Sequence, residues 1–289
     1  MQVTSVDGAE RMRIALASLC DDAGTFVNEF GPYPLAGSIA ATEQSGRDGG
    51  EQPWTAHSQG NLLFESAADH ALALTRLLIK PVTTIAPWTC VRGGLEAAAI
   101  GCWLLSESID AQVRIGRSFA YRHEGLSQQV KLAAATGDEP ARRRSLCRIE
   151  EVEAEAAALG YELIRNKSGR RDGIGQRMPT ITKLVGDTLG EEKLYRILSA
   201  MAHGHIWALT QLGFQAPDAD EPTLLKKTMN SDAAAVLLMT AVDVLAKPMW
   251  AEARLFGYDL QRLKVLLDRG YREMGLNETR HFWANGQLC

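Results

Sequence analysis

The segment 195–205, YRILSAMAHGH, gathers the side chains of this chain that are best suited to binding an anion and moving a proton. At 100° per residue along a helix, Tyr195, Arg196, Ser199 and His203 fall in one arc, opposite an apolar face. A guanidinium binds phosphate through paired hydrogen bonds, and an imidazole exchanges a proton near neutral pH. Two interpretations stay open: the arc faces a cleft that holds an anionic ligand, or it bonds neighbouring helices while His203 caps the helix end.

A second polar pair lies at the start of an apolar helix. Arg92 and Glu96 are one helical turn apart, and Trp103 follows in the same segment. An exposed pair at this spacing adds only about 0.2–0.5 kcal/mol to a helix. Beside the apolar run GLEAAAIGCWLL we expect the pair to be internal and linked to the arc of segment 195–205. Direct contact with a ligand is the alternative.

Arg114, Arg117 and Tyr121 are spaced to share one face of the next predicted helix. Together they have the chemistry to bind RNA phosphates and to stack on a base. The other interpretation is an Arg-rich face that is merely solvated.

The segment 165–179, RNKSGRRDGIGQRMP, holds five basic residues and one acid and predicts a cationic loop. Either the loop is simply mobile, or it is a flap that steers a polyanion toward the helix after it. Its Gly-x-Gly lacks the preceding strand and the third glycine of a dinucleotide site, and the chain has no GxxxxGK[ST] phosphate loop. Glu278 and His281 have ExxH spacing, without the second copy that a di-iron site needs. We therefore expect neither a cofactor nor a metal.

Composition places limits on the class of protein. The chain of 289 residues is 46% hydrophobic and 23% charged, with a net charge of −4, which is typical of a globular protein and opposes general attraction to nucleic acid. Five cysteines without a CxxC pair predict reduced thiols and a cytoplasmic location. The N-terminus has no signal-peptide pattern, and no apolar run reaches about 18 residues, so we expect no membrane partner.

Helical periodicity dominates the chain and predicts an all-α protein, an antiparallel helical bundle. Residues 24–57 are rich in Gly, Pro and Ser and predict a long irregular connection. The expected bundle domain covers 58–275, after an N-terminal helix and that connection (1–57) and before a tail (276–289). Helices are predicted over about 8–22, 58–80, from Pro87, from 108 or 110 to 135, from a cap at 138–140, over 180–189 and 191–203, from a cap at Ser231 with a kink or end at Pro248, and over 259–274.

The spacing of Arg196 and His203 resembles the Arg-x4–6-His pattern of the HEPN superfamily, helical bundles of prokaryotic defence and toxin systems and of related nucleotide-binding proteins. The similarity loosely covers residues 60–275, where a helix like VRGGLEAAAIGCWLL precedes an Arg-rich helix and a motif like YRILSAMAHG comes near the end. In catalytic members the resemblance implies metal-independent RNA cleavage. His203 would then be the general acid or base at the ribose 2′-hydroxyl or the leaving oxygen, and Arg196 would stabilise charge on the phosphate. Tyr195 and Ser199 would orient these groups, in a cleft between the two copies of a homodimer.

One departure from the pattern bears on activity. Ile197 follows Arg196, where catalytic HEPN ribonucleases usually carry Asn, Asp or His. We therefore rank binding of RNA or a nucleotide first, in stress response or phage defence with a defence partner or antitoxin that the sequence does not identify. A toxin-like endoribonuclease is the alternative, and a structural or interaction bundle is the third interpretation.

Overall fold

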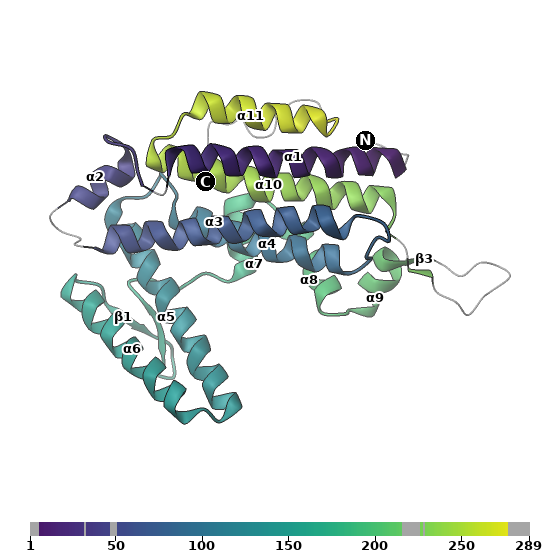
Figure 1. Cartoon of the computed structure of the whole chain (residues 1–289). Coiled ribbons are helices and arrows are strands. Elements are labelled where there is room, and N and C mark those ends of the chain that lie inside the picture. The colour runs from purple at the N-terminus through teal and green to yellow at the C-terminus, as the bar shows by residue number, and fades with distance from the viewer. Residues whose placement is uncertain (1–5, 32, 47–50, 216–225, 228, 277–289) are drawn as a thin grey trace.

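The computed structural model describes residues 6–31, 33–46, 51–215, 226–227 and 229–276, and it confirms the predicted all-α class (Figure 1). In chain order the helices are α1 (Val6–Phe30), α2 (Ile39–Ser45), α3 (Gln52–Leu77), α4 (Ala86–Leu104), α5 (Ala111–Thr136), α6 (Glu139–Ala158), α7 (Ile181–Leu184), α8 (Glu192–Ala202), α9 (Ile206–Ala208), α10 (Ser231–Phe256) and α11 (Leu260–Glu273). Single π-helical turns, η1 (Val185–Leu189) and η2 (Leu209–Gly213), follow α7 and α9. Two short antiparallel hairpins pair β1 (Leu163–Arg165) with β2 (Arg171–Ile174), and β3 (Phe214–Gln215) with β4 (Lys226–Lys227).

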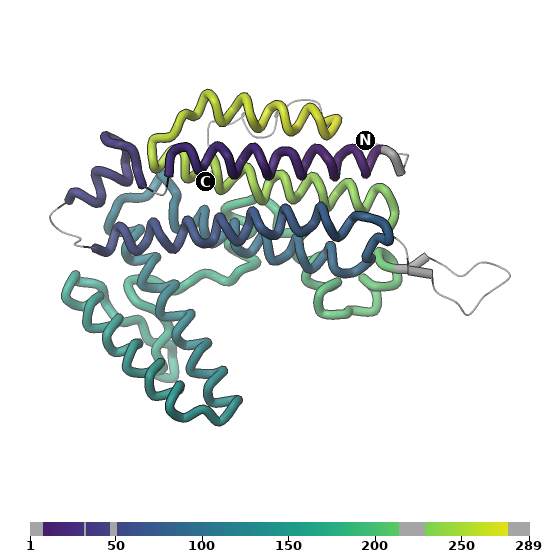
Figure 2. The backbone as a smooth tube through the Cα atoms, in the orientation of Figure 1, coloured from purple at the N-terminus to yellow at the C-terminus, as the bar shows by residue number. Residues whose placement is uncertain are grey.

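Helix α10 is the centre of the main bundle. It packs against α1, α3 and α4, and α11 lies along the outer side of α1 (Figure 2). Within the described residues α10 alone is long and apolar enough to cross a membrane, but 72% of its most apolar window is buried inside the protein. A core helix meets the same criteria, because a helix surrounded by others is apolar on every face. Helices α7 and α8 cover the remaining side of α4.

Helices α5 and α6 and the β1–β2 hairpin form an arm that projects from the bundle (Figure 1). The helices begin at Asp110 and Asp138, whose side chains accept hydrogen bonds from the backbone N–H groups of Val113 and Ala141. These are the N-caps that the sequence predicts. The arm has a hydrophobic cluster of its own, made of Ile115, Phe119, Leu126, Ile149, Val152, Ala156 and Ile174.

The predicted irregular connection over residues 24–57 is wrong for most of its length. Helix α1 continues through Gly24 to Phe30, because Phe26 extends its buried stripe and is only 1% exposed. Helix α3 begins at Gln52, with Pro53 in its first turn, where a proline removes no helical hydrogen bond. Helix α1 packs against α3, α10 and α11, so it belongs to the bundle.

Three smaller predictions also need correction. Part of the cationic segment 165–179 is paired in the β1–β2 hairpin, with Leu163 opposite Ile174. Asn230, not Ser231, caps α10. Helix α10 does not end at Pro248 but continues to Phe256, because burial on both sides of the proline outweighs the roughly 3 kcal/mol that it costs. The predicted tail and its ExxH spacing lie outside the described residues, apart from Leu276.

A buried ion pair joins the arm to the bundle. The Arg114 side chain is 0% exposed, and its Nε lies 3.0 Å from Glu43 Oε2, across 71 residues of sequence. Its two Nη groups donate to the backbone oxygens of Leu104 and Ile109 at 2.8 and 3.3 Å. Arg114 was predicted to be a ligand-binding or solvated residue; it is instead an interior residue, because Glu43 supplies the partner that burial of a guanidinium requires.

His57 completes this cluster from the other side of Glu43. Its Nε2 lies 2.9 Å from Glu43 Oε2, and its Nδ1 lies 3.1 Å from Gln44 Nε2. Burial lowers the pKa of His57, and Glu43 only partly opposes this effect. Burial alone would raise the pKa of Glu43, but the hydrogen bonds and charges of His57 and Arg114 hold it below its ordinary value. The neutral imidazole therefore donates to Glu43 and accepts from Gln44, which uses both ring nitrogens.

We expect Arg114→Gln to lower the free energy of unfolding by about 3–5 kcal/mol, because it leaves the Glu43 carboxylate buried without a cation. The measurement is urea denaturation followed by circular dichroism. The matched control is Arg143→Gln on α6, whose side chain is 75% exposed and whose loss should cost no more than about 0.5 kcal/mol. A loss below about 1 kcal/mol for Arg114→Gln would show that the ion pair is not needed.

Candidate functional site on helices α4, α8 and α9

A polar, partly buried cluster of side chains joins α4 to α8. Tyr195 is 5% exposed, and its hydroxyl donates a hydrogen bond to Glu96 Oε1 at 2.8 Å. Arg92 Nε lies 3.0 Å from the same oxygen, and the guanidinium lies 5.8 Å from the centre of the Tyr195 ring. Burial, followed by the hydrogen bond to Glu96, raises the pKa of the Tyr195 phenol, which therefore stays a donor at neutral pH. The predicted link between the Arg92–Glu96 pair and segment 195–205 is present.

Arg196 and His203 lie on the adjacent, exposed side of α8. The Arg196 side chain is 67% exposed, and its Nε and Nη2 donate to Glu192 Oε1 at 3.0 and 2.8 Å. His203 is exposed and forms the C-cap of α8, before Gly204 with a φ of +68°. The predicted arc is therefore divided: Tyr195 points into the protein, Ser199 is half-buried, and the guanidinium and imidazole face solvent.

The sequence analysis missed the apolar neighbours of these two residues. Trp207 and Ile206 of α9 follow at once and are 47% and 74% exposed. We call the exposed residues Lys193, Arg196, His203, His205, Ile206 and Trp207 the α8–α9 face. The available signal was Trp207, three residues after Gly204, since a buried stripe does not continue across such a turn.

The residues of the α8–α9 face are exposed to solvent. Two cavities in the described part of the chain, of about 550 and 670 Å³, are lined by other side chains. The predicted cleft around Arg196 and His203 is neither of these. The Arg196 and His203 side chains therefore lie on an exposed surface that a large ligand can cover.

The three residues predicted to share a face of α5 have different surroundings. Arg114 is interior, as described above. Arg117 donates to the backbone oxygen of Trp103, and its guanidinium lies 5.2 Å from that indole. Burial, and then the charge of Arg114, lower the pKa of Arg117 to about 10. Tyr121 is half-buried and lines the 670 Å³ cavity together with Arg122 and others. These residues do not form one ligand-facing row.

Several charges of the cationic segment 165–179 are already paired. Arg171 binds Glu153 at 3.0 Å, Arg177 binds Asp172 at 2.5 Å, and Arg165 donates to the backbone oxygen of Gly169. The hairpin belongs to the arm and packs on α5. No group of three or more metal-binding side chains occurs among the residues that the structure describes.

Comparison of the chain with protein-family models, with curated proteins and with solved structures gave no match.

We expect Tyr195→Phe to lower the free energy of unfolding by about 1–2 kcal/mol, because Glu96 loses a hydrogen-bond donor at a half-buried position. Guanidinium denaturation measures the change. Arg196→Gln is the control on the same helix, and its exposed pair with Glu192 should contribute less than about 0.5 kcal/mol. Equal losses for the two variants would contradict the separation of an inner and an outer side of α8.

Proposed function

We propose that the protein is a HEPN-like bundle that binds a phosphate-containing ligand, RNA or a nucleotide, through the α8–α9 face. The observation that carries the proposal is the joint exposure of a guanidinium, two imidazoles and an indole within the twelve positions from 196 to 207. A guanidinium fork matches phosphate oxygens, and an exposed indole offers a surface on which a base stacks. Single-stranded RNA presents both groups at once.

Glu192 controls the strength of this interaction. Its carboxylate accepts both hydrogen bonds that Arg196 donates. A phosphate must displace that carboxylate, and an exposed ion pair of this kind is worth at most about 1 kcal/mol. The exchange therefore costs little, while two charge-assisted bonds to phosphate replace two to carboxylate.

The buried side of α8 holds the α8–α9 face in a fixed position. Tyr195 is adjacent to Arg196 and is fixed to α4 through Glu96 and Arg92. In this proposal the three residues support the surface from beneath rather than contact the ligand directly.

Metal-independent cleavage of RNA is the alternative function of the same residues. It requires Arg196 to leave Glu192 and to reach the same phosphate as His203. A homodimer that covers α8 would convert the open face into an enclosed cleft. The exposure of both side chains in one protomer favours binding as the primary proposal.

The test of binding is fluorescence anisotropy of a labelled single-stranded RNA 12-mer at low and high salt, with unlabelled ATP as competitor. We expect salt-sensitive binding that Arg196→Ala weakens about tenfold, because one bidentate phosphate contact is lost. Glu192→Gln should tighten binding, because Arg196 is released. Arg143→Ala on the arm is the control and should change little. Absence of binding, or an Arg196→Ala variant that binds like the wild type, would refute the proposal.

The same samples decide between binding and cleavage. Wild-type protein is incubated with the RNA in EDTA, and the products are separated on a denaturing gel. Intact RNA that nevertheless binds supports the binding function. Cleavage that His203→Ala abolishes, with an unchanged circular dichroism spectrum, would make the protein a ribonuclease instead.

A further inference from the structure

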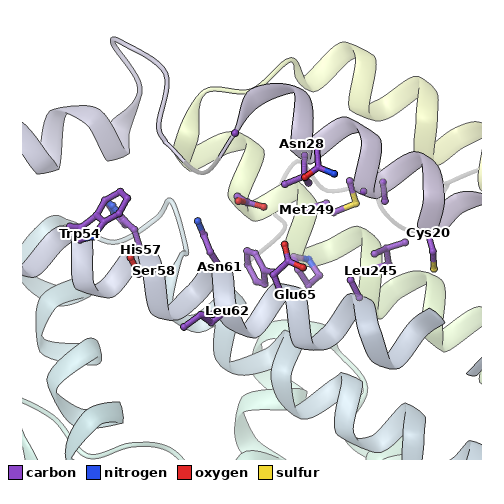
Figure 3. Close-up of a pocket in the computed structure, with 18 residues that line it drawn as sticks. Cys20, Asn28, Trp54, His57, Ser58, Asn61, Leu62, Glu65, Leu245 and Met249 are labelled. Carbon is purple, nitrogen blue, oxygen red and sulfur yellow. The ribbon is translucent and has the colours of Figure 1, made fainter. Parts of the chain in front are cut away.

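A cavity of about 550 Å³ lies between α1, α3 and α10. Its volume is in the range of small-molecule sites. Figure 3 shows the side chains of Asn61 and Glu65 pointing from α3 into the space that α1 and α10 close. Along α3 the lining residues Trp54, Ser58, Asn61, Glu65 and Ala68 recur every three or four positions. The cavity therefore follows one face of this helix.

The walls of the α1–α3–α10 cavity are largely apolar. Val27 of α1, Phe64 of α3, and Leu245 and Met249 of α10 supply much of the surface, and Trp54 stands at one end, 40% exposed. The Trp54 ring stacks on Tyr33 at a centroid distance of 5.6 Å. An alkyl or aryl group is the kind of ligand that such walls hold by removal of apolar surface from water.

Glu252 of α10 is an unusual component of these walls. It is only 6% exposed and lines the cavity, yet no hydrogen bond or ion pair is found for its carboxyl group in the described part of the chain. Burial, and then the nearby charge of Glu65, raise its pKa to about 7. A buried carboxyl group without a partner is costly, so such a group in a cavity indicates a ligand that supplies the partner.

The other polar groups of the cavity also favour a cationic ligand. Glu65 is an exposed second carboxylate, and Asn61 Oδ1 is a buried acceptor without a partner. The residues that line the cavity include no Lys or Arg. His57 is the basic side chain among them, and its two nitrogens are engaged by Glu43 and Gln44.

We propose that the α1–α3–α10 cavity binds a lipophilic amine in its ammonium form. The ammonium group donates to the Glu252 carboxylate, with Asn61 Oδ1 and Glu65 as further acceptors. The hydrocarbon part lies against Leu245, Met249 and Phe64. A cation placed over the face of the Trp54 indole is also attracted, because the face of an aromatic ring carries partial negative charge.

The proposal predicts a pH dependence of binding. Amine binding should weaken as the pH falls from about 8 to about 5, because Glu252 is then protonated and no longer attracts a cation. The groups near Glu252 on the other packed elements do not replace its charge. Burial raises the pKa of the Cys20 thiol on α1 to about 12, with a smaller contribution from Asp21. Burial and then Glu252 itself raise the pKa of Tyr258, whose hydroxyl donates to the backbone oxygen of Gly31.

The experiment is isothermal titration of the full chain with three probes of equal length: 4-phenylbutylamine, 4-phenylbutan-1-ol and 5-phenylpentanoate. At about pH 8 we expect the amine to bind at least about tenfold more tightly than the alcohol, and the carboxylate to bind most weakly. Glu252→Gln should remove the advantage of the amine and leave the affinity for the alcohol unchanged. Glu150→Gln on α6, exposed and outside the cavity, is the matched control and should bind all three probes like the wild type.

Thermal melting checks that Glu252→Gln is folded, and a higher Tm than the wild type at about pH 8 is expected, because a costly buried charge is removed. Should that variant not fold, Glu65→Gln, an exposed change at the same cavity, should weaken amine binding severalfold. Equal affinity for amine and alcohol, tighter binding of the carboxylate, or amine binding that neither substitution weakens would overturn the proposal.

Discussion

The buried guanidinium of Arg114 is the constraint on which the arrangement of helices depends. Its partners come from three places: the Glu43 carboxylate on α2, the Leu104 oxygen at the end of α4, and the Ile109 oxygen before α5. His57 of α3 closes the cluster, and its ring meets Phe256 of α10 edge-on at 5.5 Å. A buried charge is tolerated only when every donor is satisfied, so these segments have one mutual arrangement in which the cluster is stable.

One member of this cluster, His57, lines the α1–α3–α10 cavity, and another, Arg114, fixes the start of the arm. Because His57 is engaged by Glu43, it forms a fixed end to the α1–α3–α10 cavity and adds no positive charge to it. Because Arg114 holds the first turn of α5, the arm leaves the bundle at a defined place, away from α8. The buried polar side chains of this cluster therefore fix the arrangement of the helices. The polar groups that are available to ligands lie outside the cluster.

Local signals predicted much of the fold. Asp138 caps α6 within the predicted cap at 138–140, and α5 and α11 begin after Asp110 and Asp259, near their predicted starts. The same type of signal failed over residues 24–57. Glycine and proline are typical of loops, but Gly24 and Pro53 lie in helices that are stabilised by packing against distant segments of the chain. The pairing of Arg114 with Glu43 was not predictable, since it depends on a partner 71 residues away. A link from Arg92 and Glu96 to segment 195–205 was predicted, but not that Tyr195 alone of the arc would be buried to make it. Most of the α3 stripe that lines the cavity lies in the predicted helix over 58–80, but Trp54 and His57 fall in the segment that was predicted to be irregular.

Helix α4 separates the two proposed sites. Glu96 faces α8, whereas Gly94 and Gly101 face the other way, where an added Cβ would lie 3.0 Å from Val244 of α10 and 2.4 Å from Phe64 of α3. The α8–α9 face offers donors to an anion, and the cavity offers acceptors to a cation. The net charge of −4 for the whole chain does not reveal that the two proposed sites favour ligands of opposite charge. Since the two sites share no side chain, loss of binding at one by substitution does not predict loss at the other, and each proposal can fail alone.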